Sequence, residues 1–351
     1  MLLRDRIAEE ISKNRGWISF ARYMELALHA PGLGYYASGA QTFGARGDFV
    51  TAPELGSLFA RSLARQLREV DHGKILELGA GSGALAETLL KELSCEYFIL
   101  ETSAALRERQ RERLGGRVSF LDRLPERWRG IVLANEVADA MPVHVVGWTE
   151  QGIVERGVCV KDGQLAWSER PATGQLLGEA RSIQVPVPYL SEIGLAARAW
   201  MRTLCERLEQ GLLLAIDYGF PRHEYYHPQR SSGTLMCHYR HQAHADPFLR
   251  PGEEDITAHV DFSALAAAAR ATGAEILGYA TQAQFLVNCG ITDVLAEANA
   301  ENALHYAPIA AQAHKLLSPA EMGELFKVLA VGRGVERQLL GFSRGDRSDA
   351  L

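Results

Sequence analysis

The residues best suited to chemistry lie between positions 77 and 83, where an acid is followed by three alternating glycines. Glu77 stands two residues before Gly79, and Gly81 and Gly83 follow. Glycine tolerates a positive φ angle and lets a ligand approach the backbone closely. A helical pattern rich in Ala and Leu begins at Ala84, and the amides at the start of a helix attract polar or negative ligand groups. The spacing predicts a strand, a tight turn and a helix that hold a nucleotide-type ligand.

Two cofactors suit this turn. As G-x-G-x-x-G/A, the positions Gly79, Gly81 and Ala84 are typical of a dinucleotide site. As E-x-G-x-G-x-G, Glu77 and the glycines suit S-adenosylmethionine, because a carboxylate favours the ammonium and sulfonium of that cofactor and would repel a pyrophosphate. The acid favours S-adenosylmethionine, while a dinucleotide, or an ordinary turn that binds no ligand, stays open.

Further polar residues stand where short apolar runs end. The run at 96–100 ends at Glu101, and a carboxylate at the tip of the second strand is placed to hold ribose hydroxyls. The later apolar runs also end at polar residues. The carboxyl ends of parallel strands meet at one edge of a sheet, where ligands bind. The polar residues at these ends are Glu77, Glu101, Asp122, Asn135, Glu136 and Asp217.

The elements that must position these residues alternate between strand and helix, which predicts a parallel α/β sheet. A different pattern at 143–167 predicts antiparallel hairpin strands, followed by a loop at 171–188 and a helix at 190–210. The predicted core strands are 75–78, 96–100, 117–121, 130–134, 211–219, 275–279 and 326–331, with helices at 84–93, 102–114, 261–272 and 283–316.

Segments outside this core are predicted from their own patterns. Residues 1–30 are expected to form two helices, with Ser19 as the N-cap of the second. The glycine-rich aromatic stretches 31–36 and 43–54 are typical of lids or binding loops, although a plain surface linker is the alternative. Residues 341–351 are expected to be disordered.

A polar, aromatic segment at 221–259 carries clustered histidines. Such residues can bind a metal, but zinc sites usually combine them with cysteine or carboxylate at tighter spacing. We therefore predict no metal site here and expect loop or substrate-facing histidines, with His241 as the candidate for a substrate contact. The histidines concerned are His223, His227, His238, His241 and His244.

Composition limits the class of protein and its partners. The 351 residues are 47% hydrophobic and 23% charged, with a formal net charge of -6, which is typical of a globular protein and offers no basic face for nucleic acid. The basic run 107–113 alternates with acids, as on a solvated helix face. No uncharged apolar stretch is long enough to span a bilayer. Scattered cysteines and an N-terminus unlike a signal or transit peptide predict the bacterial cytoplasm.

Several motifs, in this order, resemble the MidA-like family of class I methyltransferases that use S-adenosylmethionine. That family includes the mitochondrial complex I assembly factor that methylates an arginine on a core complex I subunit. In one departure, Val137 and Ala138 stand where the family usually has two aromatic residues, so the pocket wall has less aromatic surface. The resembling segments are 29–36, 47–54, 76–83, 101–103, 135–143, 217–219, 255–262 and 281–286.

The resemblance implies an α/β fold with a Rossmann-like, seven-stranded class I methyltransferase sheet, a helical N-terminal region and an inserted hairpin and loop subdomain. The implied domains are an N-terminal helical and loop cap at 1–70, a cofactor-binding core at 71–220 with a hairpin insertion near 143–188, an insertion loop at 221–259, the C-terminal part of the core at 260–340, and a disordered tail at 341–351. The implied cofactor-binding residues are Glu77, Gly79, Ala80, Gly81, Gly83, Glu101, Thr102, Asp122, Asn135, Gly47, Asp48, Thr51, Pro53 and Glu54.

The resemblance also implies arginine as the methyl acceptor. A guanidinium is a weak nucleophile because its charge is delocalised, so carboxylates are needed beside it. We expect Glu136 to orient the acceptor, with Asn135 beside it, and Asp139 to assist or to hold the loop; a helix cap is the alternative for Asp139. Asp217 and His241 are further candidates for substrate contact.

The implied partner is a protein substrate such as a respiratory-chain subunit, with no nucleic acid and no membrane insertion. A non-catalytic assembly chaperone that binds S-adenosylmethionine and an NAD-dependent oxidoreductase are the alternative functions. The sequence does not determine the oligomeric state, and a homodimer is one of the options.

Overall fold

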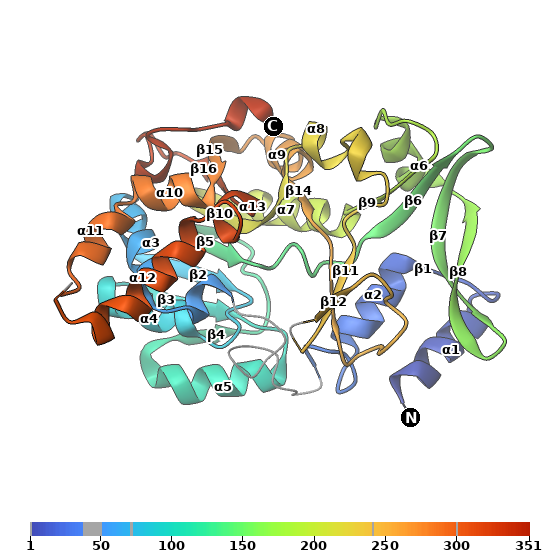
Figure 1. Ribbon diagram of the computed structural model, residues 1–351, viewed down its shortest axis with the longest axis horizontal. Coiled ribbons are helices and arrows are strands. Elements are labelled where there is room, and N and C mark those ends of the chain that lie inside the picture. Colours follow the sequence, from blue (N-terminus) through green and yellow to red (C-terminus); the bar gives the residue numbers. More distant parts are fainter. Residues whose placement is uncertain (1, 38–50, 71–72, 241, 300) are drawn as a thin grey trace. The chain divides into compact units, whose positions relative to one another are not determined.

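The structure, a computed structural model, describes residues 2–37, 51–70, 73–240, 242–299 and 301–351. It contains two compact units, each assembled from three stretches of the chain. Unit 1 comprises Met1–Phe49, Ala138–Trp200 and Pro221–Asp261, and unit 2 comprises Val50–Val137, Met201–Phe220 and Phe262–Leu351. The predicted α/β core falls in unit 2, and the N-terminal helices and hairpin strands fall in unit 1 (Figure 1).

Unit 2 contains a large mixed sheet with helices packed on it (Figure 1). Its strands are β2 (Lys74–Leu78), β3 (Glu96–Leu100), β4 (Ser119–Leu121), β5 (Trp128–Asn135), β10 (Leu208–Phe220), β15 (Glu275–Thr281) and β16 (Phe326–Arg333). Its helices are α3 (Ser57–Glu69), α4 (Ala84–Glu92), α5 (Ala104–Leu114), α9 (Phe262–Arg270), α10 (Gln282–Asn288), α11 (Ile291–Ala296), α12 (Ala303–Leu317) and α13 (Met322–Leu325), while α7 (Leu195–Arg207) runs along the chain from unit 1 into unit 2. Short 3-10 turns are η1 (Ala52–Glu54), η2 (Gly115–Arg117), η4 (Leu340–Phe342) and η5 (Ser348–Ala350).

The strand order defines where a ligand can bind. The sheet runs β15-β16-β10-β5-β2-β3-β4. Neighbouring strands from β4 to β10 are parallel, whereas β16 is antiparallel to both β10 and β15. The next two strands of the chain, β3 and β4, extend the sheet on one side of β2, and the strand after them, β5, pairs with the other side of β2. Open α/β sheets bind their ligands at such a reversal, beyond the carboxyl ends of the strands.

The middle segments of the central strands are apolar because both faces of the sheet are covered. All side chains of Ile131–Ala134 in β5 and of Leu212–Ile216 in β10 are buried, as a parallel sheet between helices requires. The prediction of an α/β fold is confirmed. The expected number of seven strands is not confirmed in detail, because β14 (Val260–Asp261) also pairs with β10, and the sheet counts eight strands among the described residues.

Unit 1 contains two antiparallel sheets and the N-terminal helices. Its strands are β1 (Ile18–Ser19), β6 (His144–Thr149), β7 (Gly152–Lys161), β8 (Gln164–Pro171), β9 (Tyr189–Ile193), β11 (Met236–Tyr239), β12 (Gln242–His244), β13 (Asp255–Thr257) and β14 (Val260–Asp261), and its helices are α1 (Leu3–Lys13), α2 (Phe20–His29), α6 (Gly174–Arg181) and α8 (Arg222–Tyr225), with the 3-10 turn η3 (Pro228–Arg230). One sheet has the order β1-β7-β6-β9 with β8 paired to β7, and the other has the order β12-β11-β13. The Ser19 hydroxyl accepts a hydrogen bond from the Arg22 amide at 3.1 Å, which confirms the predicted cap.

Two predictions in the middle of the chain are wrong. The expected loop at 171–188 contains α6, whose Leu176 and Ala180 are buried. The helix expected at 190–210 starts only at Leu195, because residues before it form β9 and pair with β6. The helix α6 is short, and β9 is defined by its pairing with β6, so neither gives a clear pattern in this proline-rich sequence.

The C-terminal segment 341–351 was expected to be disordered, and the structure shows it docked on unit 2. Asp346 Oδ1 accepts the Tyr279 amide at 3.0 Å, and the Arg347 amide donates to the Tyr279 carbonyl at 2.7 Å. The ring of Phe342 packs on that of Phe285, with centroids 5.3 Å apart. The segment is therefore held by backbone groups on the outer edge of β15, the edge strand of the sheet. Within the described part of the chain, no helix combines the length and apolar character that crossing a bilayer requires.

Candidate functional site

Most of the predicted site residues lie in unit 2, at the carboxyl ends of the strands around the reversal between β2 and β5. Glu77 is in β2, the glycine turn follows it, and Glu101 and Thr102 follow β3. Asn135 and Glu136 stand at the end of β5. The fold thus brings these sequence-predicted residues to one edge of one sheet.

The glycine turn is built from residues with positive φ. The φ angles are +62° at Gly79, +55° at Gly81 and +81° at Gly83, a region in which a side chain is strained. A Cβ atom on Gly79 would also lie 3.2 Å from Val137 Cγ2. The Gly79 amide donates to the Leu100 carbonyl at 3.0 Å, which ties the turn to the end of β3.

A buried glutamine on α5, Gln110, joins the glycine turn to Glu101. Its Nε2 donates to the Gly81 carbonyl at 2.9 Å and to Glu101 Oε2 at 3.0 Å. Sequence reasoning missed this residue. Its spacing could have revealed it. Gln110 lies four residues after Leu106 and four before Leu114, so it falls on the buried face of the helix although it is polar.

The carboxylate of Glu101 is buried and held in place from two sides. Besides the bond from Gln110, its Oε1 accepts the Ser103 amide at 2.9 Å. Burial raises the pKa of Glu101, while the Ser103 amide and the Gln110 side chain oppose the rise by stabilising the charged form. The carboxylate is thereby fixed before any ligand binds.

Glu77 is the second buried carboxylate of the site. The Tyr97 hydroxyl donates to its Oε2 at 2.8 Å. Burial raises the pKa of Glu77 to about 7; the hydrogen bond from Tyr97 acts in the opposite direction, and the charge of Glu101 adds to the rise. A buried carboxylate of this kind favours a cationic ligand group, since the cation compensates the lost hydration. Tyr97 of β3 was not predicted, because only the sheet register reveals its contact with β2.

Asn135 and Glu136 form a strained pair at the end of β5. Glu136 has φ +54°, and its amide donates to the Ile216 carbonyl at 2.8 Å. Asn135 Nδ2 donates to Glu136 Oε1 at 3.0 Å. Within the described residues, Asn135 Oδ1 is buried and has no hydrogen-bond partner. Left-handed conformations of residues other than glycine cluster at functional sites.

The segment before α3 reaches the same turn. The Ser82 hydroxyl donates to Glu54 Oε1, and Arg113 Nη1 donates to Ser82 Oγ at 2.7 Å. Thr51 is buried, and Pro53 lies in η1. Glu54 of this segment therefore contacts the glycine turn within unit 2.

Asp122 and Asp217 have contrasting surroundings. Asp122 is exposed and paired with Arg107 Nη1 at 2.6 Å. Asp217 is buried in β10, accepts the Tyr218 amide at 2.9 Å, and faces Lys327 of β16 in the strand register. A ligand can therefore bind Asp122 only if the ion pair with Arg107 breaks. Asp217 is instead a buried polar residue within the sheet.

Asp139 belongs to unit 1. It is buried in a turn where no helix begins, so the helix-cap alternative is wrong. Its charge and that of Asp255 act on Tyr36, whose hydroxyl donates to Asp255 Oδ1 at 2.9 Å; burial, together with these carboxylates, raises the pKa of Tyr36. The predicted site residues Gly47, Asp48 and His241 lie outside the described residues.

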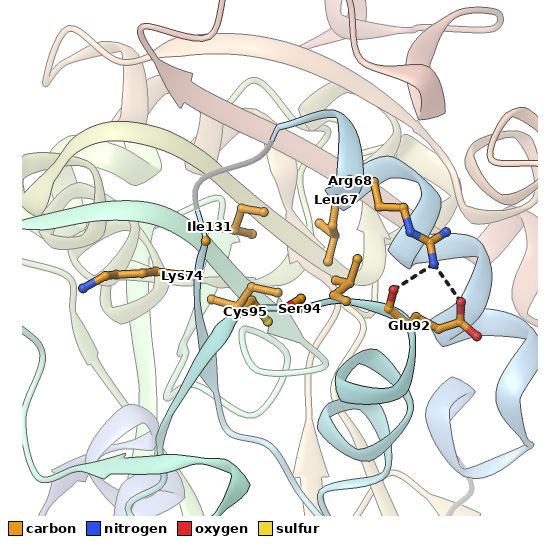
Figure 2. A pocket seen from close by; sticks show the side chains of 10 residues that line it. Leu67, Arg68, Lys74, Glu92, Ser94, Cys95 and Ile131 are labelled. Atoms are coloured by element: carbon orange, nitrogen blue, oxygen red, sulfur yellow. Dashed lines mark hydrogen bonds and ion pairs between the residues drawn. The ribbon is translucent and has the colours of Figure 1, made fainter.

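A hollow at the amino-terminal end of the sheet in unit 2 does not belong to this site (Figure 2). It is lined by the start of β2 with Lys74, by Cys95 before β3, and by Ile131 of β5. At its rim, Arg68 donates to the carbonyl and the carboxylate of Glu92, both at 2.8 Å. The hollow is thus at the end of the strands opposite to the glycine turn.

Known proteins with similar sequences and structures share this architecture. The profile of a family described as S-adenosyl-L-methionine-dependent methyltransferases matches residues 58–280. A crystal structure of a protein from Burkholderia thailandensis bound to S-adenosyl-homocysteine is 49% identical, covers 99% of this chain and 96% of its own, and superposes with a TM-score of 0.96.

Curated relatives point the same way. The mitochondrial protein arginine methyltransferase NDUFAF7 of Danio rerio is 30% identical over 90% of this chain and 83% of its own length. Its homologue in Drosophila melanogaster is 28% identical over 91% of this chain and 82% of its own length. These matches confirm the family resemblance and set the dinucleotide alternative aside. The chain belongs to the family of S-adenosyl-L-methionine-dependent methyltransferases, and S-adenosylmethionine is its cofactor.

Proposed function

We propose that this methyltransferase transfers a methyl group to a guanidinium nitrogen of an arginine in a protein. The observation that carries the proposal is the Asn135–Glu136 pair, in which a carboxylate is held by a neighbouring amide on a strained residue at the ligand-binding edge. The names of relatives at 28–30% identity, which are protein arginine methyltransferases, support the same acceptor.

We assign the cofactor contacts from the chemistry of the donor set. Glu77 would face the cationic methionine part, Glu101 the ribose hydroxyls, and the unpartnered Asn135 Oδ1 an amino group. When bound, S-adenosylmethionine supplies a methyl group on a positively charged sulfur. The other proposed contacts are Gly79, Ala80, Gly81, Gly83, Thr102, Asp122, Thr51, Pro53 and Glu54.

The role proposed for Glu136 follows from guanidinium chemistry. A carboxylate paired with two N–H groups of a guanidinium concentrates positive charge on those nitrogens, so the third nitrogen is left richer in electrons and able to attack a methyl carbon. The methylated guanidinium then loses one proton, for which a nearby carboxylate or water is the acceptor. We propose that Asp139 assists or fixes the loop and that Asp217 contributes to the substrate side.

The test is a methylation assay on the full chain with methyl-tritiated S-adenosylmethionine and protein extracts, followed by mass spectrometry of the labelled residue. Glu136→Gln should lower methyl transfer at least roughly 100-fold and leave binding of S-adenosylhomocysteine within about twofold, because Gln keeps the shape but not the charge. Glu96→Gln, on the exposed start of β3, is the matched control and should change neither quantity.

Each outcome of this assay decides a separate question. Loss of cofactor binding in Glu136→Gln would place Glu136 in cofactor recognition. Label on a residue type other than arginine would overturn the acceptor. Binding without any transfer would favour the non-catalytic assembly chaperone.

The protein substrate that we propose is a respiratory-chain subunit, an expectation that comes from the family resemblance. We also propose the bacterial cytoplasm as the compartment. All five cysteines lie in the described part of the chain and none is in a disulfide there, which supports a reducing environment.

A further inference from the structure

A cysteine, a histidine and a glutamate that the methyltransferase site does not use converge in unit 1. Cys237 lies in β11, His244 in β12, and Glu254 directly before β13. One ligand atom from each of them lies within 4.8 Å of the other two. We propose that these three side chains form a binding site for one divalent transition-metal ion, and that Zn²⁺ is the ion that fits them best.

Strand pairing, rather than sequence spacing, brings the three residues together. Cys237 and His244 are direct partners across the antiparallel pair β11–β12. On the other side of β11, Cys237 pairs with Ile256. Glu254 lies two residues before Ile256, so it is on the same face and is the diagonal neighbour of Cys237. The sequence prediction of no metal site judged only the spacing of the histidines, so it did not include a cysteine and a glutamate delivered by the sheet.

Burial and unsatisfied polar atoms favour ligand binding by this cluster. Cys237 and Glu254 are each 0% exposed, and His244 Nε2 lies 3.0 Å from Glu254 Oε2. Among the described residues, Glu254 Oε1 and His244 Nδ1 are both buried without a hydrogen-bond partner. Leaving buried polar atoms unsatisfied is costly, and a bound ion would compensate two such atoms in contacting residues.

The charges around the cluster also favour a cation. The carboxylates of Glu254, Asp246 and Asp255 all act electrostatically on the Cys237 sulfur. Arg250 Nη1 lies 3.9 Å from Glu254 Oε2, and the Arg250 side chain is 43% exposed, so this ion pair is weakened by solvent. A metal ion would displace the thiol proton to solvent and compensate both the thiolate and the carboxylate.

The mixture of donor atoms selects the metal. Thiolate, imidazole and carboxylate together suit Zn²⁺, whereas Mg²⁺ and Ca²⁺ prefer oxygen ligands alone. Three protein ligands leave a fourth tetrahedral position for water. A simple buried His–Glu pair beside a neutral thiol is the competing description, and it leaves both unsatisfied atoms unexplained.

Cobalt titration of the full chain, purified without a metal-affinity column, tests the proposal. One equivalent of Co²⁺ should give the near-ultraviolet absorption of a thiolate–cobalt bond and the visible bands of tetrahedral cobalt, and Zn²⁺ should abolish both. Cys237→Ser should remove the thiolate band, and Glu254→Gln should weaken Co²⁺ binding at least roughly tenfold. Cys159→Ser and His223→Gln, both in unit 1, are matched controls that should leave the titration unchanged.

The wild-type titration alone can overturn the proposal. Absence of a thiolate–cobalt band at several equivalents of Co²⁺ contradicts it without any variant. Retention of the band in Cys237→Ser, with the secondary structure and S-adenosylhomocysteine binding of that variant intact, would show that cobalt binds elsewhere. Neither result affects the proposed arginine methylation, which is measured separately.

Discussion

Gln110 donates to the Glu101 carboxylate at 3.0 Å, and through the same nitrogen it contacts the Gly81 carbonyl at 2.9 Å. One buried amide thus sets the separation between the glycine turn and the carboxylate proposed to hold the ribose. The consequence is that cofactor affinity depends on a residue outside any motif.

Replacing this glutamine should weaken the cofactor site without removing a motif residue. Gln110→Leu leaves the Gly81 carbonyl and one Glu101 oxygen without their donor, so we expect a loss of about 1–3 kcal/mol in the free energy of unfolding. Binding of S-adenosylhomocysteine, measured by calorimetry, should weaken at least tenfold. Gln151→Leu, in an exposed turn, should change neither value, and equal binding by Gln110→Leu and the wild type would contradict the role of this amide.

The buried carboxylate of Glu77 predicts a dependence of stability on pH. Its pKa rises from an ordinary value near 4.5 to about 7 in the folded chain, so the folded state binds the proton more tightly than the unfolded state. The stabilisation is complete below about pH 4.5 and is lost as the pH rises to 7, which amounts to roughly 3 kcal/mol for this residue. Chemical denaturation between pH 4.5 and 8 should show the fall in the ligand-free wild type, and Glu77→Gln should reduce it by that amount.

The same pKa predicts proton release on cofactor binding. A cation beside Glu77 favours its charged form, so S-adenosylmethionine binding at pH 6 should release close to one proton from this carboxyl group, and binding at pH 8.5 should release none. Calorimetry in two buffers of different ionisation enthalpy measures this number. Unchanged proton release in Glu77→Gln at pH 6 would assign the proton to another group.

The first glycine of the turn should tolerate no side chain. Gly79→Ala combines a φ angle of +62° with a Cβ placed 3.2 Å from Val137 Cγ2, and the left-handed conformation alone costs about 1–2 kcal/mol. Urea denaturation should show at least this loss. The double variant Gly79→Ala with Val137→Ala should restore only the steric part, measured against Val137→Ala alone. Full restoration would mean that the backbone angle carries no strain.

Glu136 should show a conflict between stability and activity. Asparagine adopts left-handed φ more readily than glutamate, so Glu136→Asn should keep the thermal midpoint within about 2 °C of the wild type or raise it, although it loses the contact to Asn135. Methyl transfer should fall as in Glu136→Gln. A clear destabilisation by Glu136→Asn would show that the Asn135 contact outweighs the strain.

The sequence identified those parts of the site that depend on local pattern. Glu77, the glycines and Glu101 could be found because strand ends and glycine spacing are properties of neighbouring residues. Tyr97 and Gln110 could not, because their contacts depend on how β3 and α5 pack beside β2. The same reason applies to Cys237 and His244, which only strand pairing makes neighbours. The C-terminal segment was misjudged because its partner is the edge of β15, more than sixty residues earlier in the chain.

The place of β16 in the sheet has a consequence for synthesis of the protein. This strand lies between β10 and β15, yet it is the last strand of the chain. More than a hundred residues separate the end of β10 from its partner, so on the ribosome β10 must wait with an unpaired edge until β16 emerges. Such an edge invites pairing with other chains. Truncations before Phe326 should therefore aggregate rather than yield a smaller folded methyltransferase, and a bound chaperone should matter most while residues 221–333 are being made.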